Sequence, residues 1–97
     1  MNTIHKYVLA DPDSVVALPR GSLVLSAGAQ GDDLVIWAMV NTRAEARDHR
    51  RPEARDRWRV EVYGTGHDTY FVDPTAFKGT VQMHDGLVFH VFAHKLA

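Results

Sequence analysis

Turn-forming residues divide this chain into short runs, and the spacing of the turns favours short strands over long helices. Gly31-Asp32 and Asp85-Gly86 each separate two apolar runs. Such pairs are typical of β-hairpins because both residue types tolerate the positive φ of a tight turn. No segment between turns is long and periodic enough to form the crossover helix that parallel strands need. The pattern therefore predicts an all-β fold: a small antiparallel meander or sandwich of six or seven short strands, with room for one helical turn.

Runs rich in β-branched and aromatic residues predict the individual strands. The predicted strands cover residues 3–9, 22–30, 34–40, 58–63, 69–72, 77–83 and 87–94. Residues 13–18 fit either one helical turn, capped by Asp13 or Ser14, or a further short strand. The run from Leu34 to Val40 is apolar at both odd and even positions, so it predicts a central strand that is covered on both faces.

The last hairpin has a predicted register. A two-residue turn at Asp85-Gly86 would place Gln82 opposite Phe89. The final strand is then apolar on both faces, whereas a strand with one wet face would alternate apolar and polar residues. This predicts that a second sheet or another protomer packs against it.

Length, charge and composition limit the number of domains and the classes of partner that this chain can have. A chain of 97 residues predicts a single β-rich domain, because a second domain would lack apolar surface for its own core. Within it, residues 43–56 are rich in arginine and acids and predict a charged loop, with a helical turn over Arg43 to His49. The formal net charge of −1 gives no basic field for binding nucleic acid, so no sequence-specific nucleic-acid partner is predicted.

The same sequence predicts a cytoplasmic protein with no membrane partner. It contains no cysteine, which fits a reducing compartment. Its first residues lack the apolar core of a signal peptide. Its longest unbroken apolar run, Leu34 to Val40, is far shorter than the ~20 residues of a membrane-spanning helix.

The most informative candidate site is the glycine-containing loop after the strand that ends at Tyr63. Two glycines two positions apart let consecutive backbone N–H groups face one anion, and a histidine beside them can donate to a phosphate. Aromatic rings near the loop can stack on a base, and arginines can neutralise the phosphate. The predicted ligand-binding residues are Gly64, Thr65, Gly66, His67, Tyr63, Arg59, Arg57, Trp58 and Trp37. The alternative interpretation is an ordinary tight turn that carries an exposed histidine.

Alternation along the strand places Arg57, Arg59 and Tyr63 on one face, next to this loop. Trp58 has charged neighbours and is the more plausible ligand platform of the two tryptophans. Trp37 lies in the most apolar run, where core packing is the default explanation.

The sequence predicts no catalytic residue. There is no nucleophile elbow, no cysteine nucleophile and no convincing pair of acids. His67-Asp68-Thr69 matches the His-x-Thr element that some phosphoesterases use twice, but that chemistry needs one group to accept a proton and another to donate it. A phosphodiesterase is therefore the least favoured alternative.

No metal or cofactor is predicted either. His90 and His94 lie four residues apart on a predicted strand. At the ordinary rise of a strand they are separated by about 13 Å, too far to share one metal ion.

Several segments together resemble a family of small, largely uncharacterised β-rich proteins encoded by bacteriophages and prophages. The segments that carry the resemblance are Ile4-His5-Lys6-Tyr7, Val24-Leu25-Ser26, Trp37-Ala38-Met39-Val40, Gly64-Thr65-Gly66-His67, Gly79-Thr80-Val81-Gln82 and Val88-Phe89-His90-Val91-Phe92. The resemblance spans nearly the whole chain and implies a phage origin and a role in the host cytoplasm. Small β-rich phage proteins include sponges that sequester nucleotide immune signals, usually as symmetric oligomers.

These observations lead to a functional hypothesis and an alternative. The hypothesis is a non-catalytic homo-oligomer, a dimer or higher, that binds and sequesters a small anionic nucleotide through the backbone amides of residues 64–66. The alternative is a protein-binding module that inhibits a host enzyme through the last hairpin or residues 43–56.

Overall fold

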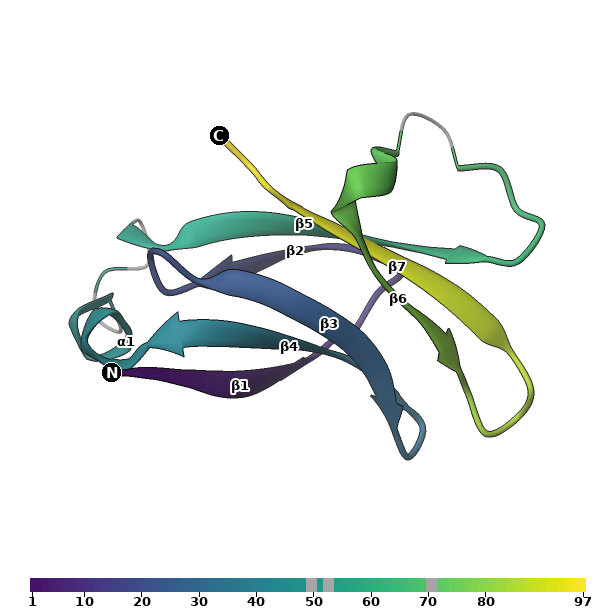
Figure 1. Ribbon diagram of the computed structural model, residues 1–97, viewed down its shortest axis with the longest axis horizontal. Helices are drawn as coiled ribbons and strands as arrows, with labels where there is room; N and C mark the ends of the chain where they lie inside the picture. Colours follow the sequence, from purple (N-terminus) through teal and green to yellow (C-terminus); the bar gives the residue numbers. More distant parts are fainter. Residues whose placement is uncertain (49–50, 52–53, 70–71) are drawn as a thin grey trace.

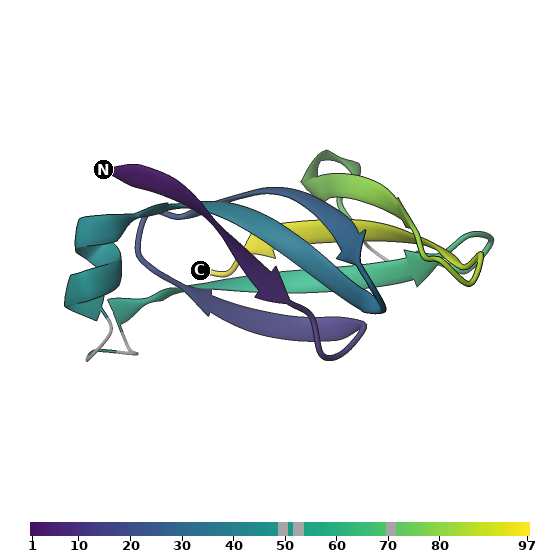
Figure 2. The ribbon, with the colours of Figure 1, turned by 90° about the horizontal axis from the view of Figure 1, so that it is seen from below.

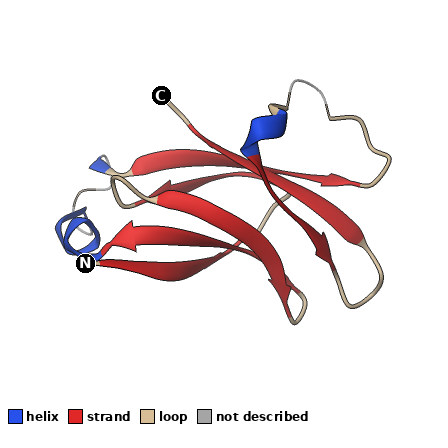
Figure 3. Ribbon diagram, in the orientation of Figure 1, coloured by secondary structure: helices blue, strands red, loops and turns tan. Residues whose placement is uncertain are grey.

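Two antiparallel sheets face each other in the computed structural model, which describes residues 1–48, 51, 54–69 and 72–97 (Figures 1 and 2). Strand is the dominant structure, as Figure 3 shows in red. The first sheet has the order β1-β4-β3, formed by Asn2–Val8, Asp33–Asn41 and Leu23–Gln30. The second has the order β2-β5-β7-β6, formed by Asp13–Leu18, Asp56–Gly64, Val88–Lys95 and Phe77–Gln82. The predicted all-β antiparallel fold is confirmed.

The elements largely follow the sequence-based expectations. The ambiguous residues 13–18 form strand β2, which pairs with β5. A helix, α1, spans Thr42–Asp48 in the predicted charged loop, and His49 lies outside the described residues. The predicted strand 69–72 is wrong where it can be checked, because Thr69 and Val72 are not in a strand; residues 70–71 lie outside the described ranges. A 3-10 turn, η2, spans Pro74–Ala76.

Neither α1 nor η2 is long and apolar enough to cross a membrane, and no other helix of the described residues is either.

The core lies between the inner faces of the two sheets. Alternate residues of each strand point inward, where they exclude water, and each fully buried aliphatic side chain contributes about 1.5–3 kcal/mol. The buried cluster consists of Leu18, Val24, Ile36, Ala38, Val40, Trp58, Val60, Val81, Val91 and Ala93.

Strand β4 is the centre of its sheet but is only partly covered on its outer face. Val35 and Ile36 are both fully buried although they point to opposite faces. Further along the outer face, Met39 is 37% exposed. The ring of Trp37 lies against Gly28 of the neighbouring strand, where a Cβ would come within 2.5 Å of the indole. The expectation of full cover is therefore wrong, because the strand shields part of this face with its own tryptophan and the rest is open.

One side of the sandwich is closed by a contact between strands of different sheets. Gly79 of β6 has a φ of +154°, and a Cβ there would lie 3.4 Å from the carbonyl oxygen of Ala27 in β3. The missing side chain lets the two backbones approach. Close approach of this kind is one of the reasons why glycine occurs inside strands.

The predicted register of the last hairpin is wrong by one residue. Gly86 has a φ of +92° and donates its N–H to Met83 O at 3.0 Å. Met83 N in turn donates to Leu87 O at 2.8 Å, so the loop contains three residues rather than two. Gln82 consequently lies opposite Val88 instead of Phe89.

Candidate functional site

Four connections meet at one end of the sandwich and enclose a cavity of about 640 Å³. This volume lies within the range of about 300–1,000 Å³ that is common for small-molecule sites. The cavity is lined by Val8, Leu9, Ala10, Asp11, Pro12, Asp32, Asp33, Leu34, Val62, Gly64, His67, Met83 and Phe89. We call it the end cavity.

Backbone hydrogen bonds hold the wall that is formed by the connection between β1 and β2. Leu9 N donates to Leu34 O at 2.9 Å, and Val62 N donates to Pro12 O at 2.8 Å. The connection is thus tied to the first sheet at its start and to the second sheet at its end. A wall fixed in this way avoids much of the ordering cost that weakens ligand binding.

The loop that the sequence singled out forms part of this cavity, and its two glycines serve different purposes. His67 N donates to Gly64 O at 3.1 Å, which closes a tight turn. Gly66 has a φ of +86° and open space around its Cα, so it is needed for the backbone conformation. At Gly64 a Cβ would lie 2.9 Å from Cε1 of His67, so the missing side chain makes room for the imidazole.

The end cavity has an apolar body and a polar rim. Side chains such as Leu34, Val62 and Phe89 supply the body. Among the described residues of its lining, the ionisable side chains are His67 and the carboxylates of Asp11, Asp32 and Asp33. Asp32 also pairs with Nδ1 of His84 at 3.1 Å. The concentration of carboxylates makes the potential unfavourable for a phosphate and favourable for a cation or a hydrogen-bond donor.

Thr65 turns from the cavity toward the outer face of the second sheet. Its Oγ1 lies 2.8 Å from Nε2 of His90, and Nδ1 of the same ring lies 3.1 Å from Oγ1 of Thr80. In a neutral imidazole one ring nitrogen donates and the other accepts, and a threonine hydroxyl can take either part. His90 therefore connects the loop to strands β7 and β6.

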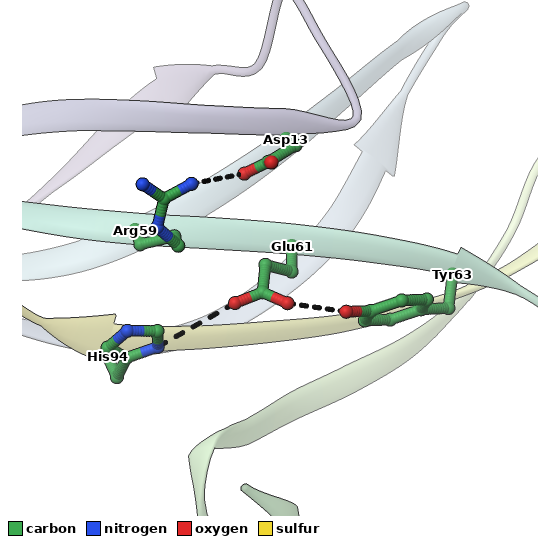
Figure 4. A network of polar contacts seen from close by, with 5 residues as sticks. All are labelled: Asp13, Arg59, Glu61, Tyr63 and His94. Atoms are coloured by element: carbon green, nitrogen blue, oxygen red, sulfur yellow. Dashed lines mark hydrogen bonds and ion pairs between the residues drawn. The ribbon is translucent and has the colours of Figure 1, made fainter. Parts of the chain in front are cut away.

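Two of the predicted partners of the loop on β5, Arg59 and Tyr63, share a face, and both are already engaged there (Figure 4). Arg59 Nη1 lies 2.9 Å from Oδ1 of Asp13 on β2. The hydroxyl of Tyr63 donates a hydrogen bond to Oε2 of Glu61, and the other oxygen of this carboxylate lies 4.0 Å from Nδ1 of His94. The hydrogen bond to Glu61, followed by burial, raises the pKa of Tyr63 to about 12.

Aromatic rings extend this outer face of β5 and β7. The ring of Phe92 makes edge contacts with Tyr63 and Phe77, with centroid distances of 5.8 and 5.5 Å. Arg57 lies exposed on the same strand face as Arg59. Because strand residues alternate, this face points away from Val62 and Gly64, which line the end cavity.

The two tryptophans occupy the reverse of their expected positions. Trp58 is only 7% exposed and lies in the core, on the opposite side of β5 from Arg57 and Arg59. Its indole Nε1 has no hydrogen-bond partner among the described residues. Trp37 lies half-buried on the outer face of the other sheet. The charged neighbours of Trp58 point outward because of the same alternation that turns the indole inward.

The structure therefore distributes the predicted site over separate surfaces. Gly64 and His67 line the end cavity, whereas Tyr63, Arg57 and Arg59 lie on the outer face of the second sheet. Most of the cavity wall, including Phe89, was not indicated by the sequence. The corrected hairpin register would have revealed it, since that register turns Phe89 inward with Val81.

Within the part of the chain that the structure describes, no three histidine, aspartate or glutamate side chains gather closely enough to hold a metal ion.

The chain belongs to the family described as a domain of unknown function, DUF7352, whose model matches residues 1–97. It is thus a member of an uncharacterised family. No curated protein and no solved structure matches it.

Proposed function

We propose that this protein binds a small molecule in the end cavity and holds it without chemical change. The observation that carries the proposal is the cavity itself: about 640 Å³, apolar in its body and polar at its rim. Such a combination of apolar lining and few polar groups is the usual character of a small-molecule site.

The lining indicates the chemistry of the ligand. An apolar ring would pack on Phe89 and Val62, and a positively charged or hydrogen-bond-donating group would face the carboxylates at the rim. A ligand whose phosphate lay here would meet like charge from Asp11, Asp32 and Asp33. The end cavity thus favours a cationic or neutral aromatic molecule over the anionic nucleotide that the sequence suggested.

The resemblance to phage proteins extends this proposal. A phage-encoded chain that holds a small molecule of its host without turnover would act by sequestration. Sequestration requires a cavity that binds the molecule and does not require a catalytic residue.

A matched pair of probes tests the ligand chemistry. Tryptamine and indole-3-acetate share the indole ring but carry an ammonium and a carboxylate group, respectively. We expect tryptamine to shift the backbone amide resonances of Gly64, His67 and Phe89 in a saturable way, and indole-3-acetate to bind more weakly. Equal binding of both, or tighter binding of indole-3-acetate, would contradict the charge argument. Recovery of unmodified tryptamine after denaturation tests the absence of turnover.

A pair of variants tests the location. Val62→Trp fills the cavity, whereas Val15→Trp makes the same substitution at a residue of β2 that is 46% exposed and does not line it. We expect Val62→Trp to abolish tryptamine binding and Val15→Trp to preserve it. Retained binding in a folded Val62→Trp protein would exclude the end cavity as the site.

A second candidate function is self-association, favoured by the outer face of the first sheet. The large apolar residues exposed on it are Ile4, Val8, Leu23, Leu25 and Met39, at 36–56%. Lys6 lies among them, and its ammonium donates to Gln30 of the same chain at 2.6 Å. A second copy of this chain would cover the face symmetrically, as in most homodimers.

A further inference from the structure

A second cavity lies at the opposite end of the sandwich from the end cavity. It has a volume of about 330 Å³ and is lined by Asn2, Arg20, Gly21, Asn41, Arg43, Ala44 and Arg47. Strand β1 runs from Asn2, in this second cavity, to Val8, in the end cavity. The six residue steps between them span about 20 Å at the ordinary rise of a strand. We call the second cavity the arginine cavity.

Its arginines come from two connections that pack beside each other. Arg43 and Arg47 are four residues apart on α1, so their side chains lie on the same side of the helix. Arg20 projects from the turn between β2 and β3. None of the described residues that line the cavity is acidic. Three guanidinium groups therefore share one concave surface.

The backbone that carries these arginines is held firmly. Ser22 N donates to Pro19 O at 3.1 Å across the turn that contains Arg20, and Gly21 N donates to Oδ2 of Asp56 at 3.0 Å. Oδ2 of Asp56 also lies 3.6 Å from Nζ of Lys95, so this carboxylate both accepts the hydrogen bond from Gly21 and pairs with a lysine.

The start of α1 is held in a similar way. Asn41 Oδ1 accepts hydrogen bonds from the backbone N–H groups of Arg43 and Ala44, at 2.9 and 3.2 Å. These amides are therefore satisfied within the chain. The positive charge of the cavity comes from the guanidinium groups rather than from the helix end.

We propose that the arginine cavity binds the phosphate group of a small phosphorylated molecule. A guanidinium group donates two parallel hydrogen bonds to a phosphate and remains charged at every physiological pH. Each guanidinium group has five N–H donors, so Arg20 and Arg47, which also interact with other groups of the chain, can still donate to a phosphate beside Arg43. The volume fits a phosphate with a small attached group. This site is independent of the end cavity and differs from it in charge.

Titration with inorganic phosphate, followed by backbone amide resonances at constant ionic strength, tests the proposal. We expect saturable shifts at Gly21, Arg43 and Ala44, without shifts at Gly64 and His67. The absence of saturable shifts around the arginine cavity would overturn the proposal. Because the two ends are followed separately, failure here leaves the test of the end cavity with tryptamine unaffected.

Charge-matched variants distinguish this site from general attraction. We expect Arg20→Gln and Arg43→Gln each to weaken phosphate binding by about tenfold, the usual cost of losing one charged hydrogen-bonding partner. Arg57→Gln removes the same charge from an exposed position on β5 and should leave the affinity unchanged. Equal weakening by all three variants, with each folded as judged by the dispersion of its resonances, would overturn the proposal.

A comparison of ligands identifies the source of the phosphate. Adenosine monophosphate and adenosine differ only in the phosphate group. Binding of the monophosphate, tighter than that of inorganic phosphate, would identify a phosphate monoester as the ligand; equal affinities would identify the free anion. Both outcomes support a phosphate site, whereas equal binding of adenosine and its monophosphate would contradict it.

Discussion

Gly64 and Gly66 are close in sequence but respond to different constraints, so their alanine variants should differ. Gly66 has a φ of +86°, and alanine there should lower the free energy of unfolding by about 1–2 kcal/mol, the cost of a left-handed conformation. At Gly64 the new Cβ would instead displace the imidazole of His67 from 2.9 Å. We expect Gly64→Ala to move the ring resonances of His67 and to alter tryptamine binding. Urea unfolding and imidazole resonances separate the two effects, and identical behaviour of both variants would contradict this account.

Tyr63 should be the last of the described tyrosines to ionise. Its hydrogen bond to Glu61 raises the pKa of the phenol to about 12, above the ordinary value of 10.0. Because the folded state holds this proton more tightly than the unfolded state, the stabilisation is complete below pH 10 and is lost as the pH rises toward 12. Glu61→Gln should lower the pKa of Tyr63, as followed by the ultraviolet absorbance of tyrosinate. Tyr63→Phe identifies the step in the titration, and an unchanged curve in Glu61→Gln would exclude the assigned cause.

At the scale of elements, the approach of β3 and β6 depends on Gly79. Its φ of +154° strains any other residue, and a Cβ would be 3.4 Å from a backbone oxygen of Ala27. We expect Gly79→Ala to destabilise the fold by about 1–3 kcal/mol, the usual cost of a strained backbone position. It should also speed hydrogen exchange in both strands. Gln82→Ala, an exposed substitution on the same strand, is the control. Equal stability of the two variants would show that the close approach is not needed.

The elements also show how far the sequence could predict this structure. Strand content and most strand boundaries followed from turn residues and β-rich runs, because both are local signals. The hairpin register could not be predicted from these signals. The loop includes His84 as a third residue because Gly86 adopts a left-handed conformation. The end cavity could not be predicted at all from local signals. It brings Leu9, Leu34 and Phe89 together through pairings between distant strands.

At the scale of the whole molecule, the apolar outer face of the first sheet should govern self-association. Met39 lies on it and is 37% exposed. We expect Met39→Lys to shift the protein toward monomer in sedimentation experiments, because two facing lysines would be desolvated and would repel each other. Val15→Lys places the same charge on the other sheet and should have no such effect. A wild-type protein that stays monomeric over the accessible concentrations would contradict this prediction.

The strand order has a consequence for how the chain reaches its fold. Among the five strand pairs of the described residues, only β3–β4 and β6–β7 join consecutive strands, whereas Asn2 lies opposite Asn41 and Asp13 lies opposite Glu61. Long loops must therefore close before these contacts stabilise anything. Two hairpins should form early and the sheets late, over milliseconds to seconds. During that interval the hairpins carry unpaired edges, so the chain is most exposed to aggregation while it folds.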